Sequence, residues 1–301
     1  WCLYKIIKNE KIDHVIVGHI LPLGVATLIV SKFTKTSYSV VLHGMDLNYA
    51  QKTSRKRNLA RKTLVKAKNI ICTNSFVKKA TEDFLNNQAG SKLFIVNPGI
   101  EGNVIIKKEI IEDIKNKHNL SGKMVLFSIG RLVKRKGFDN VIRAMPEILQ
   151  SNPNLYYFIA GDGPDKVYLK ELAKGTKNII FLGPISDEEK WAWLSICDIF
   201  IMPSRDVDGD VEGFGIVYLE ASLAGKPIVA GDSGGVRDAV LGAHSGILVD
   251  PENIDRIAGA VIGLSQDAQL RLKLGDQGRE RVKKEFNWEN QINKIFNIIH
   301  S

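Results

Sequence analysis

Residues 199–230 read IFIMPSRDVDGDVEGFGIVYLEASLAGKPIVA, and this stretch decides the fold. It begins with four consecutive apolar residues, continues through an acidic loop and a Gly-Phe-Gly insert, and reaches a helix-like segment at 216–224. Gly225, with Pro227 two residues later, ends that helix, and a second apolar run follows at 227–230. Buried parallel strands are continuously apolar rather than alternating. The stretch therefore predicts one strand–helix–strand unit of a parallel sheet.

The same alternation runs through the whole chain of 301 residues. Short apolar runs rich in β-branched residues are separated by helix-like stretches, which predicts the α/β class. The predicted strands are 14–17, 39–42, 69–73, 93–96, 124–129, 155–160, 179–182, 199–202, 227–230 and 246–249. Helical periodicity at the end of the chain covers 255–264, 269–286 and 288–299.

A polar, Lys-rich stretch at 97–122 separates two series of strands and opens with an Asn-Pro-Gly turn. At roughly 150 residues per domain, a chain of this length predicts two domains. We place the first domain at 1–110 and the second at 111–287. By its periodicity alone, the last helix would pack on the domain that precedes it.

The composition, with 44% hydrophobic and 25% charged residues, is that of a globular protein. It excludes a disordered, collagen-like or disulfide-stapled chain. Three cysteines without metal-ligand spacing fit a reducing compartment, and no apolar run reaches the roughly 18 residues that a membrane span needs. Because the chain begins at Trp1 rather than Met, we expect a further segment to precede it.

The net charge of +9 is concentrated in the first third, where residues 1–100 hold 16 Lys/Arg and 5 Asp/Glu. Residues 52–68 contain eight basic side chains and no acidic one. Such a patch attracts nucleic acid, an acidic substrate or an anionic membrane surface, and a solvated helix face is the alternative. No aromatic residue lies within 52–68, which argues against stacking on single-stranded nucleic acid. We therefore expect no nucleic-acid partner.

Two segments that follow predicted strands have the composition of phosphate and sugar sites. In 128–138, SIGRLVKRKGF, Arg131 and Lys136 precede the helix that Gly137 opens, which favours a phosphate or diphosphate. In 212–220, EGFGIVYLE, the glycines allow close approach, and residues 215–217 present free N–H groups at a helix start. The two carboxylates of this segment can accept hydrogen bonds from sugar hydroxyls. The alternative for the first segment is a solvated basic loop. For the second, Glu212 would cap the helix dipole and Glu220 would lie on a solvated helix face.

His43 follows the strand at 39–42, and a catalytic and a structural role are equally consistent with this position. The six histidines are scattered, which argues against a metal site. The chain contains no Walker-type phosphate loop, no His-Glu-x-x-His and no Gly-x-Ser-x-Gly motif.

Together, Arg131 with Lys136, the segment 212–220, the segment AGKPIVA at 224–230 and Gly234-Gly235 resemble retaining nucleotide-sugar glycosyltransferases of the GT-B fold. The residues from Asp210 to Glu220 are similar to those of phosphatidylinositol mannosyltransferases in the glycogen- and sucrose-synthase-like family. The resemblance implies two Rossmann-like parallel-sheet domains facing a cleft. The first domain would be incomplete, because the family's opening strand and Gly-rich loop have no match here. The final helix, 288–301, would pack back on the first domain.

The resemblance also implies a role for each matching residue. Arg131 and Lys136 match the pair that holds the donor diphosphate, Glu212 the contact to the donor sugar, Glu220 the ribose contact and His43 the histidine near the reacting sugar. The loop at 183–186 matches the one that receives the base. The implied donor-binding set is Arg131, Lys136, Gly183, Ile185, Glu212, Gly213, Phe214, Gly215, Ile216, Val217 and Glu220, and the implied catalytic set is His43, Arg131, Lys136 and Glu212.

The implied reaction is retaining transfer of a sugar from a GDP-sugar or UDP-sugar, with GDP-mannose preferred, to a hydroxyl of a lipid-linked or glycan acceptor. No cofactor and no metal are expected, because the cations neutralise the diphosphate. The expected location is cytoplasmic, with residues 52–68 binding the inner face of an anionic membrane. The alternatives are a nucleotide-sugar-binding module without catalysis, an epimerase of the same fold, and a nucleic-acid-binding protein that uses the basic patch.

Overall fold

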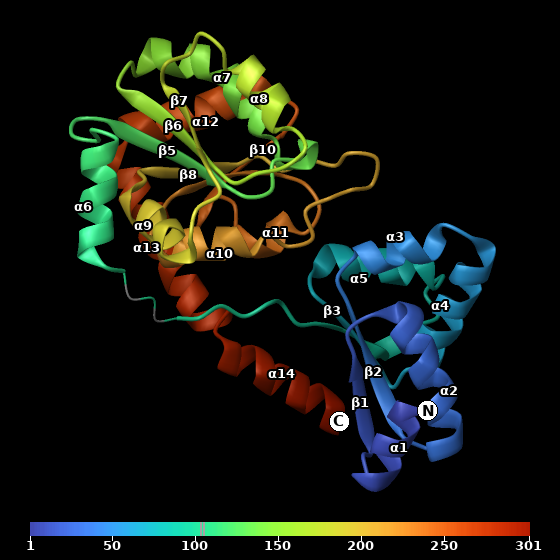
Figure 1. Cartoon of the computed structure of the whole chain (residues 1–301). Coiled ribbons are helices and arrows are strands. Elements are labelled where there is room, and N and C mark those ends of the chain that lie inside the picture. Colours follow the sequence, from blue (N-terminus) through green and yellow to red (C-terminus); the bar gives the residue numbers. More distant parts are fainter. Residues whose placement is uncertain (103, 105) are drawn as a thin grey trace. The chain divides into compact units, whose positions relative to one another are not determined.

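The computed structural model describes residues 1–102, 104 and 106–301, and the chain divides into two compact units (Figure 1). Unit 1 comprises Trp1–Gly99 and Trp288–Ser301, and unit 2 comprises Ile100–Asn287. Each unit is built on a sheet in which every strand pair is parallel. All ten predicted strands are present, so the α/β class is confirmed.

The sheet of unit 1 has the order β1-β2-β3-β4. Its strands are β1 (His14–Val17), β2 (Ser37–Leu42), β3 (Asn69–Cys72) and β4 (Leu93–Ile95). The helices are α1 (Cys2–Asn9), α2 (Val25–Thr34), α3 (Met45–Gln51), α4 (Ser54–Lys66) and α5 (Ser75–Phe84), with short turns at Ile20–Gly24 and Gly90–Lys92. Tyr38, Val40 and Leu42 alternate along β2 and enter the core beneath the helices.

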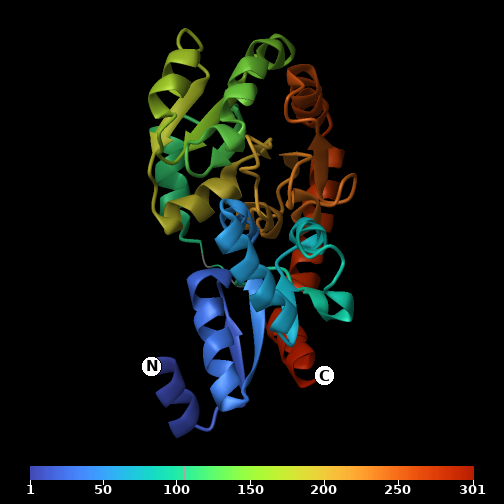
Figure 2. The same cartoon turned by 90° about the vertical axis from the view of Figure 1, so that its right-hand side faces the viewer.

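The last helix, α14 (Trp288–His300), covers the other face of this sheet, opposite α2 (Figure 2). Its Ile298 packs with Ile71 and Val96 in a separate buried cluster. Lys68 Nζ donates to the carbonyl of Ile299 at 2.9 Å, and Asn69 Nδ2 donates to the carbonyl of Ile298 at 2.8 Å. The helix α14 thus belongs to unit 1 and adds a buried cluster to it, as the resemblance implied.

The sheet of unit 2 has the order β10-β9-β8-β5-β6-β7. Its strands are β5 (Met124–Ile129), β6 (Leu155–Ala160), β7 (Ile179–Gly183), β8 (Ile199–Met202), β9 (Ile228–Gly231) and β10 (Gly246–Val249). Consecutive residues Leu126 and Phe127 belong to different core clusters, one on each face. Both faces are therefore covered, as the continuous apolar runs of these strands predict.

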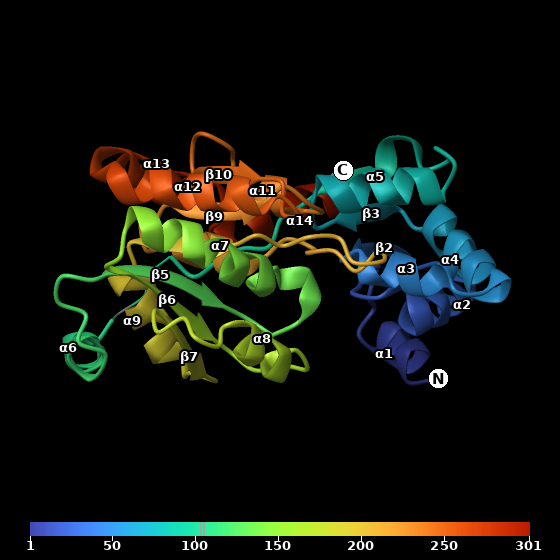
Figure 3. The ribbon, with the colours of Figure 1, turned by 90° about the horizontal axis from the view of Figure 1, so that it is seen from above.

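Helices lie on both sides of this sheet (Figure 1). One side holds α7 (Phe138–Ser151), α8 (Lys166–Leu172) and α12 (Ile254–Gln266). The other side holds α9 (Asp187–Ile196), α10 (Ile216–Leu223) and α11 (Val236–Ala239), with α6 (Lys108–Lys117) against α9 and α13 (Ala268–Glu285) against α10. α12 and α13 follow each other in the chain, and both contact β10, the strand at one edge of the sheet (Figure 3).

The structure places the first boundary between units after Gly99 rather than at residue 110. The stretch at 97–122 is not a simple linker, because it contains α6, which packs against α9. Ile110, Ile111 and Ile114 face the core of unit 2 from this helix. The lysines of the stretch conceal this amphipathic pattern when only polarity is considered, so residues 100–110 belong to unit 2.

Within the described residues, no helix combines the length and the apolar character that a bilayer crossing requires.

Candidate functional site

The candidate site lies at the carboxyl edge of the unit 2 sheet, where two neighbouring strands end. β5 pairs with β8 through Phe127 and Phe200, although the two strands are distant in sequence. The loop at 130–137 leaves β5 and the loop at 203–215 leaves β8 at the same edge. Because parallel strands end together, the two predicted segments are brought into contact.

Lys136 and Glu212 form a buried ion pair between these two loops. Lys136 Nζ donates to Glu212 Oε2, and the two residues are only 9% and 7% exposed. Arg135 Nη1 donates to the same carboxylate oxygen at 2.8 Å, and Arg135 Nε lies 3.3 Å from Asp210 Oδ1. A buried charge is costly unless it is paired, so each cation depends on the acidic residues facing it. The sequence predicted Lys136 and Glu212 but not Arg135 or Asp210.

Arg131 lies two residues after the end of β5 and differs from Lys136 in its surroundings. Its side chain is exposed, and among the described residues it has no hydrogen bond or ion pair. A guanidinium that is not already paired can bind phosphate oxygens through two parallel hydrogen bonds. Among the described residues, the loop after β5 therefore holds Arg131 as an unpaired cation, in addition to the paired Arg135 and Lys136.

The start of α10 lies in the same loop region and is open to an anion. Gly215 precedes the helix with φ of +79°, and no side chain caps the first turn. A Cβ at this position would lie 2.5 Å from the ring of Tyr218, so only glycine fits. Phe214 is buried beside Phe286, with ring centroids 5.9 Å apart, and its side chain faces the core. At Gly213, Phe214 and Gly215, any ligand contact is therefore made by the backbone; Ile216 is exposed and Val217 is half-buried.

Glu220, one turn into α10, is half-buried and paired rather than solvated. Lys190 Nζ lies 2.6 Å from Glu220 Oε1 and 2.6 Å from Asp187 Oδ1. Burial alone would lower the pKa of Lys190, but its hydrogen bonds to Asp187 and Glu220 raise the pKa above its ordinary value. Lys190 thus joins Glu220 to the N-terminal turn of α9, which follows the predicted base loop at 183–186.

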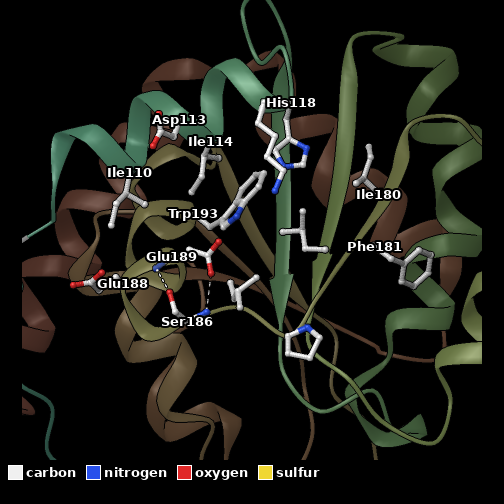
Figure 4. A pocket seen from close by; sticks show the side chains of 14 residues that line it. Ile110, Asp113, Ile114, His118, Ile180, Phe181, Ser186, Glu188, Glu189 and Trp193 are labelled. Carbon is white, nitrogen blue, oxygen red and sulfur yellow. Dashed lines mark hydrogen bonds between the residues drawn. The ribbon is translucent and has the colours of Figure 1, made fainter.

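The base loop also borders a pocket of about 680 Å³ between α6, β7 and α9 (Figure 4). Ile114, Ile180 and Trp193 contribute apolar side chains to its lining. Ser186 and Glu189 form a capping box at the start of α9, drawn in Figure 4 as two hydrogen bonds. The lining includes Ile185 but not Arg131, Lys136, Glu212 or Glu220. This pocket is therefore adjacent to the base loop and separate from the charged cluster.

His43 belongs to unit 1, whereas the other predicted site residues belong to unit 2. It is exposed after β2, and its backbone N–H donates to Asp46 Oδ1 at 3.1 Å. The ring of His19, which follows the neighbouring strand β1, lies 6.2 Å away. His19 was not predicted, although Gly18-His19 follows its strand much as His43-Gly44 follows β2. The carboxyl edge of the unit 1 sheet thus presents two imidazoles.

Comparison with curated proteins places the chain among glycosyltransferases. It is 38% identical over 174 residues to a GDP-mannose-dependent monoacylated alpha-(1-6)-phosphatidylinositol monomannoside mannosyltransferase from Corynebacterium glutamicum, covering 57% of this chain and 45% of the relative. A related mannosyltransferase from Mycobacterium tuberculosis is 33% identical over 192 residues, covering 62% of this chain and 50% of the relative. The matched region spans about half the length of these relatives.

Solved structures and a sequence family give the wider relationship. HepE from Anabaena, solved in complex with UDP, superposes with a TM-score of 0.85 at 19% identity, covering 99% of this chain and 81% of that one. Sucrose-phosphate synthase from Thermosynechococcus elongatus superposes with a TM-score of 0.79 at 21% identity, covering 99% of this chain and 75% of that one. Both establish the GT-B fold. Residues 110–281 match the family described as glycosyl transferases group 1, and the chain belongs to that family.

Proposed function

We propose that this chain transfers mannose from GDP-mannose to a hydroxyl of a lipid-linked or glycan acceptor. The observation that supports it most directly is the Lys136–Glu212 pair beside Arg131 and the uncapped start of α10. The donor is proposed from the GDP-mannose-dependent relatives, and the lipid-linked acceptor from the phosphatidylinositol mannosides in their names. Neither a cofactor nor a metal is part of the proposal.

In the proposed reaction, the bond between the sugar C1 and the diphosphate oxygen breaks while a bond from C1 to the acceptor oxygen forms on the same face. The acceptor proton passes to the departing phosphate, so anomeric configuration is retained. Negative charge grows on that phosphate, where Arg131, Lys136 and the N–H groups of α10 would stabilise it. Glu212 would contact the sugar, Glu220 the ribose, and His43 would orient the sugar from unit 1.

The first test is a thermal-shift screen of the full chain with GDP, UDP and ADP. A nucleotide that binds only the folded state stabilises it by about 2.7 kcal/mol at 100 times its Kd, which corresponds to a rise of about 5 °C in Tm. We expect GDP to give the largest rise. If none of the three nucleotides raises Tm, the nucleotide-sugar assignment fails. Turnover of GDP-mannose with a lipid extract then separates an enzyme from a binding module.

The proposed lipid-linked acceptor lies in an anionic membrane, and residues 52–68 would bind the inner face of that membrane. These residues begin between α3 and α4 and include all of α4. Within the described part of the chain, none of their eight basic side chains has an ion pair with an acidic residue. Six are exposed, and Lys56 and Arg61 are half-buried. Unpaired surface cations retain their full attraction for anionic headgroups.

We expect this patch to bind phosphatidylserine vesicles at low salt. Each basic residue contributes about 1 kcal/mol near such a surface, so replacing Lys52, Arg55, Lys62 and Lys66 with Gln should weaken binding about 100-fold or more. Matched replacements in unit 2, at Lys170, Lys177, Lys273 and Lys283, remove the same charge and should have little effect. Cosedimentation measures both. Binding that is unchanged at 1 M salt, or that is equal for the two variants, contradicts the proposal.

A further inference from the structure

Arg205, three residues after β8, is a buried cation that the sequence did not single out. It is 3% exposed. Its Nη2 donates to Asp139 Oδ2 at 2.8 Å, and its Nε lies 3.5 Å from Glu252 Oε1. Its backbone N–H donates to the carbonyl of Arg135 at 2.8 Å. One residue therefore joins the loop after β8 to the loop after β5, to the first turn of α7 and to the turn after β10.

The contacts of Arg205 bracket Lys136. The backbone of Arg135 is held on one side of Lys136, and the side chain of Asp139 is held on the other. Between them, Gly137 lies so close to the loop after β8 that a Cβ there would be 2.1 Å from the carbonyl oxygen of Pro203. The segment that presents Arg135 and Lys136 to Glu212 is thus anchored to the β8 loop on both sides of Lys136.

Stability alone is a poor explanation for this buried pair. Exchanging a buried ion pair for apolar side chains of similar volume is often neutral or stabilising, whereas removing one partner is costly. Arg205 Nη1 is also buried without a hydrogen-bond partner among the described residues, which costs further free energy. An apolar pair would lack the directional hydrogen bond of the planar guanidinium. This bond to Asp139 fixes where the 135–139 segment lies.

We infer that Arg205 is a positioning residue, whose pairing with Asp139 sets Arg135 and Lys136 at the distance a donor diphosphate requires. The inference rests on the proposed function, because it assumes that Lys136 binds the diphosphate. Arg205 acts through Lys136 and Arg135 and need not touch the donor itself. Its loss should therefore weaken recognition of the terminal phosphate more than recognition of the nucleoside.

The test compares the affinities of GDP and GMP for the full chain by calorimetry. The variants are Arg205→Lys, which keeps the charge but loses the fork, Asp139→Asn, and the double variant Arg205→Met/Asp139→Leu. We expect each to weaken GDP binding at least tenfold and GMP binding less than threefold. The double variant should keep Tm within a few degrees of the parent. Arg143→Lys, an exposed position on α7, is the matched control and should change neither affinity.

Lys136→Ala, measured in parallel, separates the two possible failures. If it selectively weakens GDP binding while all the Arg205 and Asp139 variants alter GDP and GMP equally or not at all, Arg205 has only a structural role and the inference is overturned. If Lys136→Ala leaves GDP affinity unchanged, the diphosphate assignment itself is wrong. If the double variant does not fold, Arg205→Lys and Asp139→Asn decide the outcome, because each gives the same comparison of the loss of GDP affinity with the loss of GMP affinity.

Discussion

Replacing Lys136 with alanine is expected to lower kcat/KM for GDP-mannose by more than tenfold and on the order of 100-fold. The substitution removes a cation that would neutralise the departing diphosphate, an effect that commonly exceeds 2 kcal/mol at one donor in a transition state. It also leaves the buried Glu212 carboxylate with Arg135 as its remaining cation. Both consequences impair departure of the diphosphate, so we expect this substitution to have the largest effect on the rate.

Arg131→Ala should give a loss of more than tenfold as well, because Arg131 is an unpaired guanidinium at the same edge, which can bind phosphate oxygens through two hydrogen bonds. Lys134→Ala is the control, since Lys134 is an exposed lysine of the same loop without an ion pair in the described structure. We expect it to change the rate less than about twofold. Steady-state kinetics over a range of donor concentrations measures all three. Unchanged rates for Lys136→Ala and Arg131→Ala would refute the diphosphate assignment.

The second large effect is expected from Gly137→Ala. Gly137 has φ of +75°, which costs an L-residue about 1–2 kcal/mol. The added Cβ would also lie 2.1 Å from the carbonyl oxygen of Pro203, where the backbone of one loop must move. We expect a total loss of about 3 kcal/mol or more in the free energy of unfolding, measured by urea denaturation.

Gly122→Ala provides a matched control for the backbone conformation. Gly122 has nearly the same φ, +72°, but a Cβ there meets nothing within 4 Å. Gly122→Ala should therefore lower the free energy of unfolding only by the cost of the positive φ. The difference in this free energy between the two variants measures the cost of the contact with Pro203. Equal losses would show that the 135–139 segment shifts away from Pro203 at no cost. Gly137→Ala should also weaken GDP binding, and Gly122→Ala should not.

The strands could be predicted because each is a continuous apolar run, and burial on both faces of a parallel sheet leaves that pattern in the sequence. The boundary between units could not be placed by the same reasoning. The lysines of α6 made the stretch at 97–122 resemble a linker, whereas Ile110 and Ile114 on one side of that helix decide its packing. The polar composition of this stretch predicted a linker, but the packing of its isoleucines places it in unit 2.

At the site, the sequence indicated the residues whose chemistry and position after a strand are informative by themselves, such as Lys136 and Glu212. It did not indicate Arg135, Lys190 or Arg205, because their roles depend on partners far away in the chain. Lys190 meets Glu220 only because α9 and α10 lie on the same side of the sheet, 30 residues apart in sequence. Arg205 meets Asp139 across 66 residues. Such pairs become visible only once the order of the strands is known.

The chain leaves unit 1 at Gly99 and returns to it at Trp288, so unit 1 is formed by two segments that are far apart in the sequence. A ribosome therefore exposes the whole of the first sheet before it has made the helix that covers Ile71 and Val96. Until α14 has been synthesised, unit 1 lacks this helix, whereas all residues of unit 2 have already been made. A premature stop codon just ahead of Trp288 would consequently leave every residue of unit 2 in place and remove a helix from unit 1.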